Sequence, residues 1–183
     1  MLLRQTSSAA QLPVAPRPFH DEALGGWIGR LAAQYGISVA QMCTEYCLPI
    51  PLQATPIGWL LIPRLPVEEL ERLAWLTRID IAQLQPLQSP SDSLLDAEGC
   101  LYCSKCLFLN PVDVFSPYWK RQWFRPSFIQ CSHHPGSTNW LSRCKTRDCK
   151  NFDSVLEEAS FIEKKRHQRE RERERERERS RRH

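Results

Sequence analysis

The chain has 183 residues, an apolar fraction of 42% and a formal net charge of +4, and it contains eight Cys and 14 Pro. This length suffices for one compact core or two small domains, and no apolar run approaches the roughly 20 residues of a membrane span. The start, Met1-Leu2-Leu3-Arg4, lacks the apolar region and cleavage site of a signal peptide. We therefore expect a cytoplasmic protein whose clustered Cys and His bind metal rather than form disulfides.

Residues 1–19 are expected to form an extended arm, because they are polar and contain Pro13, Pro16 and Pro18. A first helix is predicted from Asp21, which can cap it, to Gly36, a natural C-cap. Its apolar face recurs at helical spacing, with Leu24, Trp27, Ile28, Leu31 and Tyr35. Ser38 can cap a second helix that extends to about Cys47, before Pro49.

A second helix pair is predicted after the proline-rich residues 48–64. Pro66 stands at the start of its first helix, and Asp80 can cap its second. Residues 31–42 and 73–84 align at an offset of 42, with Ile37 and Ile79 at equivalent turns. The repeated pattern favours helix-turn-helix modules over ordinary helical hairpins, without indicating that either second helix enters DNA. We expect a helix-turn-helix-like domain over residues 20–88, followed by a linker over 89–99.

Residues 100–152 predict a small zinc-finger module. A C-x2-C pair and a C-x2-H pair can supply four tetrahedral ligands and leave no open position, as in a structural Zn²⁺ site. Our choice of ligands is Cys103, Cys106, Cys131 and His134. Cys100 competes for a place because Cys100-x2-Cys103 has the same spacing, and His133 competes with His134. Cys144 and Cys149 are candidates for a second site, but no further pair follows to complete it.

Aromatic and basic residues alternate between the two ligand pairs. One interpretation is a surface that stacks on bases or contacts phosphates or a protein partner, for which the candidates are Lys120, Arg121, Trp123 and Arg125. The other is that Trp119 and Trp123, at i,i+4, pack the module against the helices, and we favour packing for these two rings. No H-E-x-x-H, phosphate-binding glycine loop or carboxylate cluster is present, so an enzyme is not expected.

The C-terminal segment, residues 153–183, is dominated by a strict alternation of Arg and Glu. In a helix this alternation places like charges at i,i+4, so we expect a disordered, solvated tail. Residues 161–183 contain 11 Lys or Arg and six Asp or Glu, and residues 1–160 therefore carry 14 minus 15, or −1. By bulk charge, residues 1–160 are not typical of a nucleic-acid-binding domain. The expected fold class is mainly α, with the zinc module and tail following the helices.

Two separate motifs resemble the TniQ family. Pro16-Arg17-Pro18, then Asp21-Glu22-Ala23-Leu24 and Trp27-Ile28-Gly29-Arg30-Leu31-Ala32, resemble its opening signature, approximately P-x-P-x-x-D-E-S-L-x-S-W-L-x-R-L-A. Tyr102-Cys103-x2-Cys106-Leu107, Trp123, Cys131-x2-His134, Leu141 and Cys144 are similar to its zinc-finger stretch in order and spacing. The resemblance covers residues 13 to about 149. The chain departs from the family after Cys144, where the usual C-P-x-C is replaced by an irregular Cys144-x4-Cys149.

This resemblance implies a non-catalytic accessory protein of DNA transposition that acts in target-site selection. The implied partners are a AAA+ ATPase that regulates transposition and either target DNA or a CRISPR effector complex, which would associate the protein with the nucleoid. We also consider a homodimer. The alternative is a zinc-containing helix-turn-helix transcription regulator, which would bind specific DNA tightly and in a salt-dependent manner. The −1 charge of residues 1–160 favours the accessory role.

Overall fold

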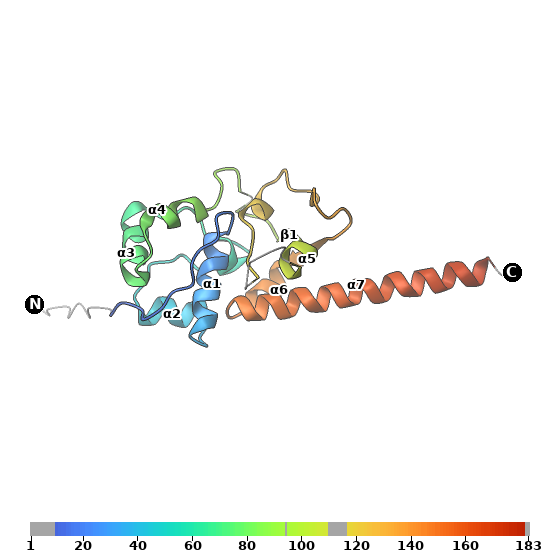
Figure 1. Ribbon diagram of the computed structural model, residues 1–183, viewed down its shortest axis with the longest axis horizontal. Helices are drawn as coiled ribbons and strands as arrows, with labels where there is room; N and C mark the ends of the chain where they lie inside the picture. Colours follow the sequence, from blue (N-terminus) through green and yellow to red (C-terminus); the bar gives the residue numbers. More distant parts are fainter. Residues whose placement is uncertain (1–9, 94, 110–116, 182–183) are drawn as a thin grey trace, which may run out of the picture.

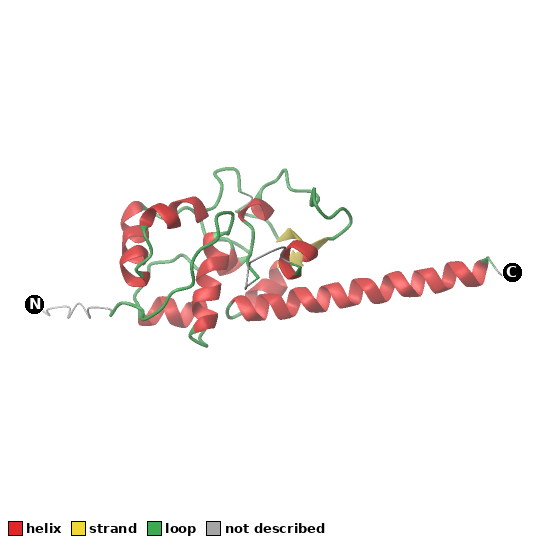
Figure 2. Cartoon of the chain, in the orientation of Figure 1, coloured by secondary structure: helices red, strands yellow, loops and turns green. Residues whose placement is uncertain are grey.

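The computed structural model of the protein describes residues 10–93, 95–109 and 117–181. About half of the chain is helical, and the described residues contain one small sheet (Figures 1 and 2). The helices are α1 (Leu24–Gln34), α2 (Val39–Glu45), α3 (Val67–Thr77), α4 (Ile81–Leu84), α5 (Ser104–Phe108), α6 (Arg143–Asp148) and α7 (Phe152–Ser180). Short 3₁₀ turns form η1 (Gly58–Leu60), η2 (Gln85–Leu87) and η3 (Arg121–Phe124). Strands β1 (Gly99–Cys103) and β2 (Thr138–Ser142) pair antiparallel.

The two predicted helix pairs have the same local geometry. Ser38 forms a capping box at the start of α2, and the Asp80 carboxylate accepts a hydrogen bond from the Ala82 amide at the start of α4. Gly36 and Arg78, equivalent at the offset of 42, both have a left-handed backbone, with φ of 67° and 57°. Each of the two is followed by a half-buried Ile that packs against the core. The internal repeat is thus present in three dimensions.

The N-terminal arm lies along the helices instead of extending away from them. Within its described part, residues 10–19, Leu12 is buried and its amide donates to the Leu76 carbonyl at 2.8 Å. The Trp27 indole donates to the Pro16 carbonyl at 2.8 Å, which fixes the arm on α1. Residues 1–9 of the expected arm lie outside the described residues.

The expected cap of the first helix is wrong. The N-cap of α1 is Ala23, with no side-chain cap, and Asp21 forms an ion pair with Lys120 at 3.0 Å instead. Glu22 is fully buried and binds the Arg30 guanidinium through two contacts of 2.7 and 2.8 Å. Burial raises the pKa of Glu22, while Arg30 and the Phe19 amide oppose that shift. Asp21 and Glu22, which the sequence placed at the start of the first helix, therefore form ion pairs with Lys120 and Arg30.

Residues 21–23 are also joined by backbone hydrogen bonds to the segment between the two predicted ligand pairs. The Arg121 amide donates to the Asp21 carbonyl, and the Ala23 amide donates to the Trp119 carbonyl, both at 2.8 Å. Glu22 and Lys120 form an isolated antiparallel bridge between these bonds. The N-terminal helices and the cysteine-rich segment are thereby attached directly to each other.

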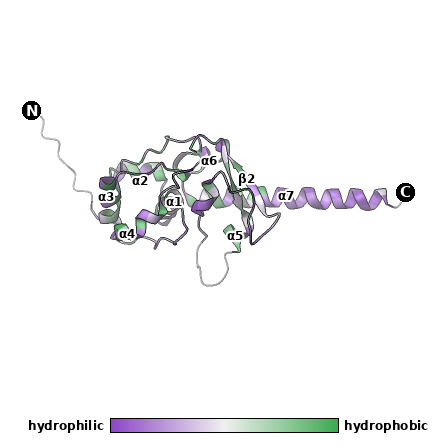
Figure 3. Ribbon diagram, turned by 90° about the horizontal axis from the view of Figure 1, so that it is seen from above, coloured by the Kyte–Doolittle hydropathy of each residue, from purple (hydrophilic) through white to green (hydrophobic). Residues whose placement is uncertain are grey.

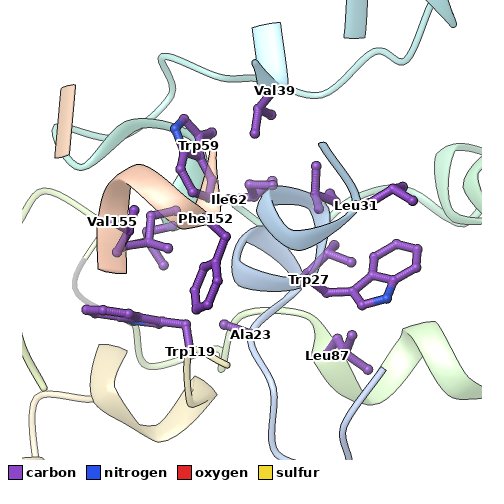
Figure 4. Packing of buried hydrophobic residues seen from close by; sticks show 14 of the residues in the cluster. Ala23, Trp27, Leu31, Val39, Trp59, Ile62, Leu87, Trp119, Phe152 and Val155 are labelled. Carbon is purple, nitrogen blue, oxygen red and sulfur yellow. The ribbon is translucent and has the colours of Figure 1, made fainter. Parts of the chain in front are cut away.

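One apolar cluster continues through both of these regions. In Figure 4, Trp119 of the cysteine-rich segment and Phe152 of α7 lie on one side of α1, and Trp27 of α1 points to its other side; all three belong to one cluster of buried residues. Trp27 and Trp119 are completely buried. The ring centroids of Trp119 and Trp123 lie 4.9 Å apart at an interplanar angle of 88°, a favourable edge-to-face arrangement. The packing interpretation of the two tryptophans therefore matches the structure.

The C-terminal segment forms a helix, so the expectation of a disordered tail is wrong for its first half. Phe152, Val155 and Ala159 are buried at helical spacing, and side chains remain partly buried as far as Arg166. Beyond this point α7 projects from the molecule as an exposed, polar helix (Figures 1 and 3). Alternating Arg and Glu place opposite charges at i,i+3, which offsets the like charges at i,i+4. Residues 182–183 lie outside the described part.

None of the helices in residues 10–93, 95–109 and 117–181 combines the length and the apolar character that crossing a bilayer requires.

Loss of the buried Glu22–Arg30 pair should strongly destabilise the protein. In Glu22→Gln the guanidinium loses its carboxylate, and breaking a buried pair typically costs about 3 kcal/mol of unfolding free energy. The matched control is Glu98→Gln, which breaks the exposed Glu98–Arg143 pair and should cost less than about 1 kcal/mol. Urea unfolding followed by tryptophan fluorescence measures both values. Equal losses would show that the buried pair has no special role.

The two halves of α7 should contribute unequally to stability. Phe152→Ala removes a buried ring and should lower the free energy of unfolding by about 3 kcal/mol. In a chain that ends at His167, the described residues that are lost, 168–181, are all exposed, and stability should change by less than about 0.5 kcal/mol. Thermal unfolding of both variants checks this difference. A large loss in the shortened chain would instead mean that the projecting half supports the fold.

Candidate metal centre

Three cysteines and one histidine gather at one end of the small sheet. The ligand atoms of Cys103, Cys106, Cys131 and His134 all lie within 4.8 Å of one another. The His134 Nδ1 atom lies 3.6, 3.3 and 3.8 Å from the Sγ atoms of Cys103, Cys106 and Cys131. The Sγ atoms of Cys106 and Cys131 are 3.5 Å apart. The three cysteines are buried and His134 is half-buried.

These distances match the edges of a tetrahedral metal site. A Zn²⁺ ion with Zn–S bonds of about 2.3 Å and Zn–N bonds of about 2.0 Å separates its ligand atoms by roughly 3.5 to 3.8 Å. Burial, together with the neighbouring Cys131 and Cys103 sulfurs, raises the pKa of Cys106 to about 12. A bound cation reverses this effect because it stabilises the thiolate that ligates it. The group can therefore hold a metal with four protein ligands, which leaves no open position for a reacting water.

The first pair of ligands is positioned where β1 continues directly into α5. Cys103 is the last residue of β1, and its sulfur accepts a hydrogen bond from the Cys106 amide at 3.4 Å. This bond turns the backbone so that both thiols face the same point. Ser104 is buried at the start of α5, and its amide donates to the Ser137 carbonyl at 2.9 Å. The first pair is thus tied to the loop that contains the second pair.

The second pair of ligands lies in the loop before β2. Strand pairing places Cys103 opposite Thr138, and the Thr138 hydroxyl accepts a hydrogen bond from the Cys131 amide at 3.3 Å. The Arg166 guanidinium of α7 donates to the Gly136 carbonyl at 2.9 Å. The sequence does not indicate this role of Arg166, because the contact spans 30 residues and Arg166 lies among many other charged residues.

The structure also distinguishes the competing ligands. Cys100 and His133 are not part of any cluster of potential ligands within the described residues. Cys100 lies three residues before Cys103 on β1, so its side chain points to the opposite face of the strand. Cys144 is exposed and Cys149 is buried at the end of α6, and neither joins such a cluster in the described ranges. The described residues therefore do not support a second metal site at Cys144 and Cys149.

The candidate contact residues have different surroundings. Trp123 is 2% exposed and so offers no ring face to a partner, which corrects its place among the candidates. Lys120 is held by Asp21, and Arg121 donates to the Pro86 carbonyl. Arg125 is exposed. Of the four, Arg125 is the most accessible to a partner.

Zinc content should depend on the four gathered residues and not on their neighbours. The purified protein should contain one zinc per chain, and Cys131→Ser or His134→Ala should lose it together with the fold of the hairpin. His133→Ala and Cys144→Ser are matched controls that should retain it. Metal analysis combined with thermal unfolding measures both effects. Retention of zinc in Cys131→Ser or His134→Ala would overturn the ligand assignment.

Comparison with known proteins places the chain in a family. Its sequence matches the TniQ family over residues 13–135, which is more than half of the 183 residues. The matched segment includes residues 13–19 of the arm, the Glu22–Arg30 pair and all four residues of the candidate metal centre. No curated protein and no solved structure matches the chain. The chain belongs to the TniQ family, and it is accordingly a transposition-associated accessory protein.

Proposed function

We propose that the protein acts in target-site selection for DNA transposition, as an adaptor that bridges target DNA or a targeting complex to a AAA+ regulator. The observation that carries this proposal is the family match, which includes both the N-terminal signature and the metal centre. The direct attachment of residues 21–23 to residues 119–121 supports it, since an adaptor has to transmit the position of one partner to the other.

The surroundings of α2 favour an adaptor over a conventional DNA reader. In a helix-turn-helix protein the start of the second helix contacts base edges. Here the Val39 amide at the start of α2 donates to the Lys150 carbonyl at 2.8 Å, and the Asn151 amide group donates to the Ile37 carbonyl. The backbone at the start of α2 is thus hydrogen-bonded to the junction between α6 and α7. Helices α2 and α4 also contain no Lys or Arg to contact phosphates.

The metal centre supports a structural role in this proposal. Four protein ligands would close the coordination sphere of Zn²⁺, so the ion would stabilise the β1–β2 hairpin instead of activating a water. Non-catalytic action is also general among TniQ proteins. The protein would contribute binding surfaces, and the chemistry of strand transfer would belong to its partners.

Binding to the AAA+ ATPase of the same transposition system tests the proposal. We expect the full chain to bind that ATPase in a calorimetric titration, and to bind double-stranded DNA weakly by itself. Loss of zinc should abolish ATPase binding in His134→Ala, whereas the control His133→Ala should retain it. Transposition into a defined target should fall in parallel.

A different outcome would favour the transcription regulator. Tight and sequence-specific binding of duplex DNA by the isolated protein, with affinity that falls steeply with salt and no binding to the ATPase, would contradict the adaptor.

A further inference from the structure

A second surface with recognisable chemistry lies between β2 and the middle of α7. It is a groove of about 540 Å³ whose lining includes residues of β2, α6 and α7. We call it the α7 groove, and the lining residues that its chemistry depends on are Trp140, Lys145, Phe161, Lys165, Arg169 and Arg173. None of these residues belongs to the candidate metal centre.

Two large aromatic side chains are exposed in the α7 groove. Trp140 is 50% exposed and Phe161 is 47% exposed. The Trp140 ring is held in place against the backbone of Gly99 on the paired strand, because a Cβ atom at position 99 would lie 2.6 Å from that ring. A flat ring fixed in this way and open to solvent is a stacking platform. Phe161 has the Lys165 ammonium group 4.3 Å from its centroid, which keeps a positive charge beside it.

The charge of the α7 groove is strongly positive. Its lining contains five basic side chains and two carboxylates, Glu158 and Glu170. Glu158 pairs with Lys145 at 3.1 Å, and Glu170 contacts Arg166 at 3.6 Å. Lys165, Arg169 and Arg173 form no ion pair with the described residues, so their charges are available to a ligand. The lining thus has an excess of three positive charges, five minus two, and Glu163, which contacts Arg166 at 2.8 Å, lowers the local excess to two. This still contrasts with the −1 of residues 1–160.

We propose that the α7 groove binds single-stranded nucleic acid, with a base stacked on Trp140 and phosphates on Lys165, Arg169 and Arg173. Stacking platforms beside rows of cations are the typical means by which proteins hold unpaired strands without reading their sequence. A duplex keeps its bases stacked on each other and cannot cover Trp140. An acidic peptide would satisfy the cations but would leave the exposed indole without a partner. The proposal does not rest on the adaptor function.

Fluorescence anisotropy with labelled oligonucleotides of about 16 nucleotides, the upper end of typical site sizes, tests this proposal on the full chain. Oligo(dT), oligo(U) and a duplex of the same length are compared, and the two single strands separate DNA from RNA as the ligand. We expect at least one single strand to bind more tightly than the duplex. The logarithm of its association constant should fall with the logarithm of salt concentration, with a slope of about −0.7 for each phosphate contacted.

Variants of the α7 groove separate stacking from charge. Trp140→Leu should weaken binding about tenfold, whereas Trp140→Phe should retain most of it because an aromatic face remains. Trp75, equally exposed at 50% but on α3, provides the control Trp75→Leu, which should bind normally. Lys165→Glu should reduce both affinity and salt slope. Lys164→Glu is its control, since the adjacent Lys164 faces a different hollow on α7.

Several results would overturn the proposal. These are no binding of either single strand, tighter binding of the duplex, unchanged binding in Trp140→Leu, or equally tight binding of polyglutamate. Thermal unfolding and zinc content of each variant show whether a loss of binding reflects a lost fold. If Trp140→Leu unfolds, the Lys165→Glu and Lys164→Glu pair still decides the outcome.

Discussion

The attachment of residues 21–23 to residues 119–121 is the constraint on which the rest of the structure depends. Two backbone hydrogen bonds and the Asp21–Lys120 ion pair join the start of α1 to the cysteine-rich segment. Trp119 is thereby placed against α1 and becomes part of the common core. Neither region could move as a separate body without exposing this ring. Two segments that are at least 96 positions apart in the sequence (119 minus 23) are thus parts of one structural unit.

The buried ion pair explains why the N-terminal signature contains such different residue types. Glu22 is buried with Arg30, and the Arg30 guanidinium also donates to the Arg17 carbonyl and lies over the Phe19 ring. The Glu22 carboxylate, the Phe19 ring and the Arg17 carbonyl together surround the Arg30 guanidinium, which has little access to water. The proline-rich arm supplies two of these groups, which gives an otherwise extended segment a defined path along α1.

The sequence alone predicted local features well and long-range contacts poorly. The caps at Ser38 and Asp80, the repeated turn and the spacing within each pair of potential metal ligands are features of a few residues. The grouping of the two pairs, 25 residues apart, is a long-range contact that their complementary ligand types predict. The predicted cap at Asp21 is wrong because an acidic residue before an apolar helix can either cap the helix or form an ion pair. The sequence does not show that Lys120 lies close enough to Asp21 to form that pair. In α7 the spacing of Phe152, Val155 and Ala159 indicates a buried helical face that precedes the alternating charges, so the start of this helix was predictable from the sequence.

The projecting half of α7 has a mechanical consequence. A helix rises about 1.5 Å per residue, so the 14 residues from 167 to 180 hold its end roughly 20 Å beyond the last partly buried side chain. Residues 174–179 contain three Arg and three Glu and carry no net charge. This part of the helix would therefore act as a stiff spacer that occupies volume without attracting ions. Any neighbouring molecule that approaches along α7 would be kept at that distance by steric exclusion alone.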